Sequence, residues 1–126
     1  MKLRIRGNSL RLRLRQGEVR ALVERGVVEE RTEIGPAGRT FGYAVRADDA
    51  AGAVSAEFTG ERIVVRVPGA VVRAWSSGEE VGIEASQPAP GGDALRILIE
   101  KDFECLNAPP EEPQDGAYPH PRQAKC

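Results

Sequence analysis

K-L-R-I-R-G-N-S-L-R-L-R-L, residues Lys2 to Leu14, alternates apolar and cationic side chains on both sides of a Gly-Asn pair. Successive side chains of a strand point to opposite faces, so the leucines and the isoleucine share one face and the arginines take the other. Gly and Asn tolerate positive φ, which suits a two-residue turn. The stretch therefore predicts a β-hairpin in which Arg6 pairs with Ser9, Ile5 with Leu10, Arg4 with Arg11, and Leu3 with Leu12.

The polar face of this hairpin places Arg4 directly opposite Arg11. Like charges that face each other in a sheet are destabilising by roughly 0.2–1 kcal/mol. We therefore expect negative charge close to this face, supplied by a bound anion or by the chain itself. The carboxylates that could neutralise it are Glu29, Glu30 and Glu33 on the next predicted strand and Glu57 on a second hairpin.

The charge of the chain is divided between its two parts. Overall, 18 basic and 19 acidic residues give a net charge of −1, which argues against a general polyanion binder. Residues 1–46 carry 11 Lys and Arg against 5 Glu, hence +6, whereas residues 47–126 carry 7 against 14, hence −7. This asymmetry fits a basic binding face, and it fits equally well an attraction between the two parts of the chain.

The rest of the chain predicts a mainly β (α+β) protein. Residues 16–26 have helical spacing and end on a glycine, which indicates a short helix. Alternating stretches between turn residues predict strands over 27–34 and 40–46, a second strand-turn-strand over 55–67, a helix from Pro68 to Trp75, and strands over 80–87 and 94–101. We expect the domain to cover residues 1–106, with Trp75 in its core, and residues 107–126 to form a flexible Pro-rich tail.

The element order suggests an internal repeat. Residues 7–29 laid on residues 60–82 give six identities in 23 positions without a gap. The chain is therefore predicted to hold two β-β-α-β-β units, over about 2–48 and about 55–102. Eight mostly antiparallel strands and two short helices would bury their apolar faces as one antiparallel barrel or as two packed sheets.

The repeat identifies which charges the fold itself does not require. The candidate ligand-binding residues are Arg4, Arg6, Arg11 and Arg13, and their equivalents in the second unit are Glu57, Thr59, Val64 and Arg66. Guanidinium groups bind phosphate or carboxylate through paired hydrogen bonds. We predict a non-enzymatic interaction module with an arginine-lined anion-binding face, whose partner is a small anion or an acidic protein and not a membrane.

Catalytic and metal-binding signals are weak. Residues 100–105 combine three acids, a lysine and a thiol, but a nucleophilic Cys105 needs a base, and the one histidine, His120, belongs to the Pro-rich tail. We interpret this segment as a strand end or as charge partners of the arginines. Cys105, His120 and Cys126 match no zinc spacing, so no metal or cofactor is expected. Two cysteines, a charged N-terminus and no long apolar run predict a cytoplasmic protein.

Two segments resemble a known family. G-N-S-L-R-L-R-L at residues 7–14 and L-R-I-L-I-E-K-D-F-E-C-L at residues 95–106 are similar to a small family of uncharacterised bacterial proteins of about this length. The resemblance spans nearly the whole chain. It implies a class of protein and no assigned activity.

A local resemblance points to DNA binding. Residues 7–13, and residues 62–68 with the helix and residues 79–83 after them, resemble the swapped-hairpin domains of AbrB and MazE type, in which two chains interleave and bind DNA. The chain differs from this pattern in two ways. The first unit has Arg15 at the position where the pattern has Pro, and the second unit lacks most of the cationic residues. A further alternative is a phosphate-ester enzyme similar to the tunnel-shaped triphosphate enzymes, although their acidic E-x-E-x-K strand is absent.

Overall fold

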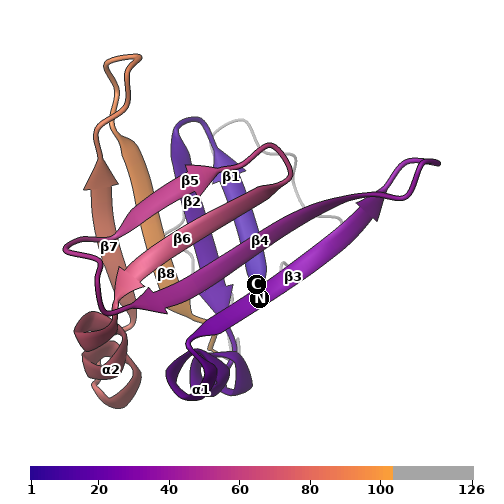
Figure 1. Ribbon diagram of the computed structural model, residues 1–126. Helices are drawn as coiled ribbons and strands as arrows, with labels where there is room; N and C mark the ends of the chain where they lie inside the picture. Colours follow the sequence, from indigo (N-terminus) through magenta and orange to yellow (C-terminus); the bar gives the residue numbers. More distant parts are fainter. Residues whose placement is uncertain (104–126) are drawn as a thin grey trace, which may run out of the picture.

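The computed structural model describes residues 1–103, which form two four-stranded sheets and two short helices (Figure 1). In chain order the elements are β1 (Lys2–Arg6), β2 (Ser9–Leu14), α1 (Gln16–Arg25), β3 (Val27–Ile34), β4 (Arg39–Asp48), β5 (Ser55–Phe58), β6 (Arg62–Pro68), α2 (Gly69–Ser77), β7 (Gly82–Gln87) and β8 (Leu95–Lys101). The order β-β-α-β-β occurs twice. The predicted mainly β fold with two packed sheets is thus confirmed, and no closed barrel forms within residues 1–103.

The two halves of the chain interleave. Sheet A has the strand order β1-β2-β8-β7 and sheet B the order β3-β4-β6-β5, so each sheet joins the first hairpin of one half to the second hairpin of the other. The four hairpins are antiparallel, whereas the central pairs β2/β8 and β4/β6 are parallel. Parallel neighbours need a long connection. Between β2 and β8 it includes elements of both halves, whereas between β4 and β6 it holds only β5.

The first hairpin has the predicted register. Leu3 pairs with Leu12, Arg4 with Arg11 and Ile5 with Leu10. The turn between β1 and β2 depends on Gly7, whose φ of 54° lies in the left-handed region that glycine enters without a steric penalty. As a result, the leucines of β2 face sheet B, and the arginines face away from it.

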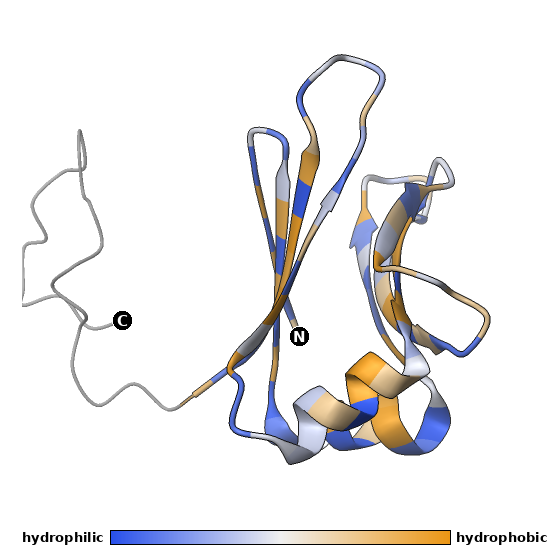
Figure 2. Ribbon diagram, turned by 90° about the vertical axis from the view of Figure 1, so that its left-hand side faces the viewer, coloured by the Kyte–Doolittle hydropathy of each residue, from blue (hydrophilic) through white to orange (hydrophobic). Residues whose placement is uncertain are grey.

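The core lies between the sheets and against the helices, which cover one end of the sandwich (Figure 2). Its fully buried side chains come from both sheets and both helices: Leu12, Leu14, Leu22, Val45, Val65, Val67, Val72, Ile97 and Ile99. Burying each of them contributes about 1.5–3 kcal/mol. Trp75 is 2% exposed, as its predicted place in the core requires, and its indole N–H donates a hydrogen bond to the carbonyl of Val81 at 3.1 Å.

Polar contacts hold the two sheets together at their edges. On one side the Gln87 side chain of β7 accepts a hydrogen bond from the backbone N–H of Ala56 at 2.7 Å and donates one to the Ala56 carbonyl at 3.0 Å. On the other side the amino group of Met1 forms ion pairs with Glu18 and Glu30. Burial alone would lower the pKa of this amino group, but the hydrogen bonds and the attraction of the two carboxylates outweigh it and raise the pKa.

Several sequence-based expectations concern residues outside the described range 1–103. Cys105, His120, Cys126 and the Pro-rich segment 107–126 lie beyond residue 103. Within residues 1–103, neither helix has the length and apolar character needed to cross a bilayer.

Candidate anion-binding face

The outer face of sheet A carries a regular array of side chains. The strand register aligns its outward positions in three rows: Arg6, Ser9, Arg96 and Ser86; Arg4, Arg11, Leu98 and Glu84; Lys2, Arg13, Glu100 and Gly82. We call these twelve positions the basic face. It holds six cations and two carboxylates, so its net charge is +4 (6 − 2).

Glu100 of β8 partly neutralises this face. Its Oε1 lies 2.5 Å from the Nε of Arg11 and 3.3 Å from the Nε of Arg13, the residue beside it on β2. The Glu100 side chain is 17% exposed. One carboxylate therefore bridges two of the four predicted arginines and relieves part of the repulsion between Arg4 and Arg11.

The pKa of Glu100 reflects this bridge. Partial burial alone would raise the pKa of the carboxyl, because burial disfavours the charged form. The hydrogen bonds and the charges of Arg11 and Arg13 act in the opposite direction and prevail, so the pKa lies below its ordinary value. Glu100 is accordingly a carboxylate at neutral pH.

The carboxylates expected to neutralise the arginines have other partners, and that expectation is wrong for three of them. Glu29 forms an ion pair with Arg62 at 2.7 Å, and Glu57 forms one with Arg66 at 2.7 Å. Glu30 is paired with the Met1 amino group. All three belong to sheet B, whereas the arginines point outward from sheet A.

Three cations of the basic face have no partner in the described part of the chain. Arg4 and Arg6 on β1 and Arg96 on β8 are exposed, and no carboxylate of residues 1–103 lies within 4.0 Å of their guanidinium groups. Lys2, at the opposite end of β1, forms an ion pair with Asp102 at 3.4 Å. The unpaired positive charge therefore gathers toward the end of sheet A that carries the β1-β2 turn.

The equivalent face of sheet B serves as an internal control. The hairpin of sheet B that corresponds to β1-β2 is β5-β6, the first hairpin of the second half. Its Arg66 forms an ion pair with Glu57 on the neighbouring strand. In sheet A the corresponding position on β1 is Arg4 instead of a glutamate. The two halves thus share a backbone plan, but sheet A has Arg4 where sheet B has the acid that pairs with its arginine.

Arg96 was not among the candidate residues from the sequence. The alternation along residues 95–101 places Arg96, Leu98 and Glu100 on one face, but only the pairing of β8 with β2 brings that face beside the arginines. Glu100 was expected to act as a strand end or a charge partner, and it forms the bridge between Arg11 and Arg13.

The arrangement differs from that of a tunnel-shaped enzyme. No barrel closes within residues 1–103, the arginines lie outside, and the interior of this region buries no charged side chain. The same region has no cluster of three or more His, Cys, Asp or Glu residues that could hold a metal ion. What the basic face can do chemically is bind anions through exposed guanidinium groups.

Comparison with known proteins places the chain in a class. A family model described as a family of unknown function, DUF7009, matches residues 1–122. No curated protein and no solved structure matches the chain, and the local likeness to AbrB and MazE domains finds no support in these comparisons. The expected membership of a small uncharacterised family is confirmed: the chain belongs to DUF7009, a family of unknown function.

Proposed function

We propose that this protein is a binding module whose basic face holds an extended polyanion, with an acidic polypeptide as the partner that fits best. The observation that carries the proposal is the set of exposed guanidinium groups of Arg4, Arg6 and Arg96, which have no carboxylate partner within residues 1–103. Leaving like charges together on one sheet face is unfavourable, and a bound anion would remove that cost.

The spacing of the cations supports an extended partner. Outward side chains recur at every second residue of a strand, about 7 Å apart, and neighbouring strands lie about 4.8 Å apart. Arg4 and Arg6 are such neighbours along β1. An extended peptide with acids at alternate positions repeats its carboxylates at the same interval of about 7 Å. Each carboxylate could therefore meet its own guanidinium group.

Duplex DNA is the second candidate, favoured by the exposed arginines alone. The basic face contains no aromatic side chain, so it offers no platform on which unpaired bases could stack. Contacts would be to phosphates, with a steep dependence on salt. The net charge of the chain is −1, so the surface outside the basic face is acidic on balance. A long duplex that extends beyond the basic face would be repelled by this surface, whereas a short peptide would stay on the face.

Binding can be tested at low salt by fluorescence anisotropy. The probes are a labelled peptide of alternating Glu and Ser, inorganic polyphosphate as competitor, and a short DNA duplex. The Arg4→Ser/Arg6→Ser variant should bind the peptide about 10-fold more weakly, if each exposed pair contributes about 0.7 kcal/mol.

A matched control has the same change in net charge. Arg31→Ser/Arg46→Ser removes two cations of sheet B that form no ion pair within residues 1–103, and it should bind the peptide like the unaltered protein. Equal losses in both double variants would refute a specific face. No peptide binding at low salt would refute the proposal, and tighter binding of the duplex than of the peptide would move the assignment to DNA.

A further inference from the structure

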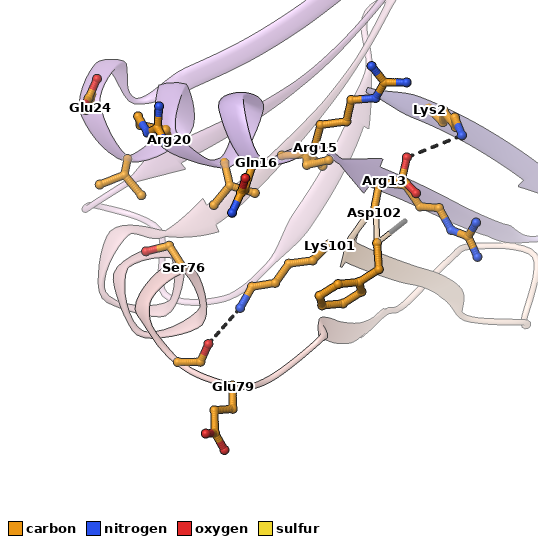
Figure 3. A pocket seen from close by; sticks show the side chains of 15 residues that line it. Lys2, Arg13, Arg15, Gln16, Arg20, Glu24, Ser76, Glu79, Lys101 and Asp102 are labelled. Atoms are coloured by element: carbon orange, nitrogen blue, oxygen red, sulfur yellow. Dashed lines mark hydrogen bonds and ion pairs between the residues drawn. The ribbon is translucent and has the colours of Figure 1, made fainter. Parts of the chain in front are cut away.

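An open groove adjoins the basic face at the end of sheet A opposite the β1-β2 turn. It is lined by the last residues of β2 and β8, by α1, and by the end of α2 and the turn after it (Figure 3). Lys2 and Arg13 belong both to this groove and to the basic face. The groove and the basic face therefore adjoin at these two residues.

The groove has an excess of cations. Its lining includes Lys2, Arg13, Arg15, Arg20 and Lys101 against Glu24, Glu79 and Asp102. Lys2 is paired with Asp102, and the Lys101 ammonium group donates a hydrogen bond to the Gly78 carbonyl at 2.9 Å. Arg15 and Arg20 are exposed and form no ion pair within residues 1–103. Two guanidinium groups are thus available to an acidic ligand.

The groove differs from the basic face in its exposed apolar side chains. Val23 on α1 is 44% exposed, and Phe103, which follows β8, is 64% exposed. Val19 and the buried Leu14 also belong to the lining. Such side chains gain free energy when another apolar group covers them. A phosphate backbone cannot provide that cover, but a large side chain of a polypeptide can.

We infer that the partner of the basic face is an acidic polypeptide segment that ends in a large apolar residue, which packs against Val23 in the groove. The inference rests on the proposed function and specifies its partner. The acidic part would pair with the exposed arginines of the face and with Arg15 and Arg20, and the apolar residue would anchor the segment. Charge sets the attraction, and the anchor sets the position along the groove.

The test uses the full chain and two labelled peptides of about twelve residues, roughly 40 Å when extended. Both peptides alternate Glu and Ser. The second also carries one Phe, and it is made in two forms, with the Phe near the N-terminus or near the C-terminus. The Phe peptide should bind about 10-fold more tightly than the peptide without Phe. Val23→Ser should remove this gain, so that the two peptides bind the variant with equal affinity.

The matched control is Val71→Ser, which changes a valine of α2 that is 38% exposed and does not line the groove. This variant should keep the full gain from Phe, and thermal melts should show that both variants are folded. Equal affinity of the two peptides would refute the anchor while leaving the basic face intact as a binding surface. Tighter binding to anionic phospholipid vesicles than to the Phe peptide would also overturn the inference, since the groove would then face a lipid surface.

Discussion

Glu100→Gln is the substitution that best tests the bridge on the basic face. It keeps the size of the side chain and removes the charge shared by Arg11 and Arg13. Hydrogen bonds to charged groups contribute about 1.5–3 kcal/mol when sheltered, whereas exposed ion pairs contribute about 0.2–1 kcal/mol. Because the Glu100 side chain is 17% exposed and the Arg11 side chain 27% exposed, we expect an intermediate loss of about 2 kcal/mol in the free energy of unfolding.

This loss should depend on pH in a defined direction. The folded-state pKa of Glu100 lies below the ordinary glutamate value of 4.5, so the ionised carboxylate stabilises the folded protein above about that pH. As the pH falls through the lower folded-state pKa, the carboxylate is protonated and the stabilisation is lost. The difference between the unaltered protein and Glu100→Gln should therefore be constant near neutral pH and shrink in acid.

Urea unfolding followed by the fluorescence of Trp75, the one tryptophan of the chain, would measure both quantities. A loss of about 2 kcal/mol corresponds to a fall of about 6–10 °C in Tm for a chain of this size. Glu84→Gln is the control, because Glu84 lies on the same face, is exposed, and forms no ion pair within residues 1–103. Equal stability of the two variants at neutral pH, or a difference that persists unchanged in acid, would refute the bridge.

The same substitution also tests the proposed function. Removal of the Glu100 charge releases Arg11 and Arg13 and raises the net charge of the basic face by one. The affinity for the acidic peptide should then rise by about 3–10-fold, equivalent to about 0.7–1.4 kcal/mol. A variant that is less stable and yet binds more tightly would show that Glu100 competes with the ligand for the same guanidinium groups.

Three other substitutions test the scaffold. Gln87→Leu leaves the backbone groups of Ala56 without their partner and should cost about 1–3 kcal/mol in urea unfolding, with faster hydrogen exchange of the Ala56 amide; unchanged exchange would argue against the contact between the sheets. Gly26→Ala should cost about 1 kcal/mol and lower the Tm by a few degrees, because Gly26 ends α1 with φ of 79°, and no loss would mean that the turn relaxes. Trp75→Phe should cost about 1–2 kcal/mol by circular dichroism, because it removes the indole N–H that donates to the Val81 carbonyl and replaces the ring 5.7 Å from the Lys101 ammonium group by a smaller one. An unaltered Tm would contradict both roles of Trp75.

Local patterns of the sequence predicted the strands and helices well, because each element carries its own signal. The Gly7-Asn8 turn and the alternation around it determine the hairpin register, and the helical spacing before Gly26 determines α1. The same local patterns do not determine which strands become neighbours in a sheet. Ile97 and Ile99 fit equally well in any buried strand, so nothing along residues 95–101 specifies a parallel partner.

The candidate site was predictable in part for the same reason. Arg4 and Arg11 belong to one hairpin, so their opposition could be read directly from the turn. Arg96 and Glu100 reach the same face only through the pairing of β8 with β2, a contact between residues 87–89 positions apart in the chain. The other carboxylates expected as partners of the arginines, Glu29, Glu30, Glu33 and Glu57, lie on strands of the other sheet.

The interleaved halves also constrain how the protein can fold. Within residues 1–103, β1 and β2 precede the other strands in the chain, and β2 gains its second neighbour only when β8 is available. Pairing at such sequence separations requires the closure of a long loop before the contact stabilises anything, which slows folding. Until then the open edge of β2 is exposed to pairing with other chains. The alternating arginines of β2 would bring positive charge to this edge, and charged side chains along an open edge oppose pairing with other chains.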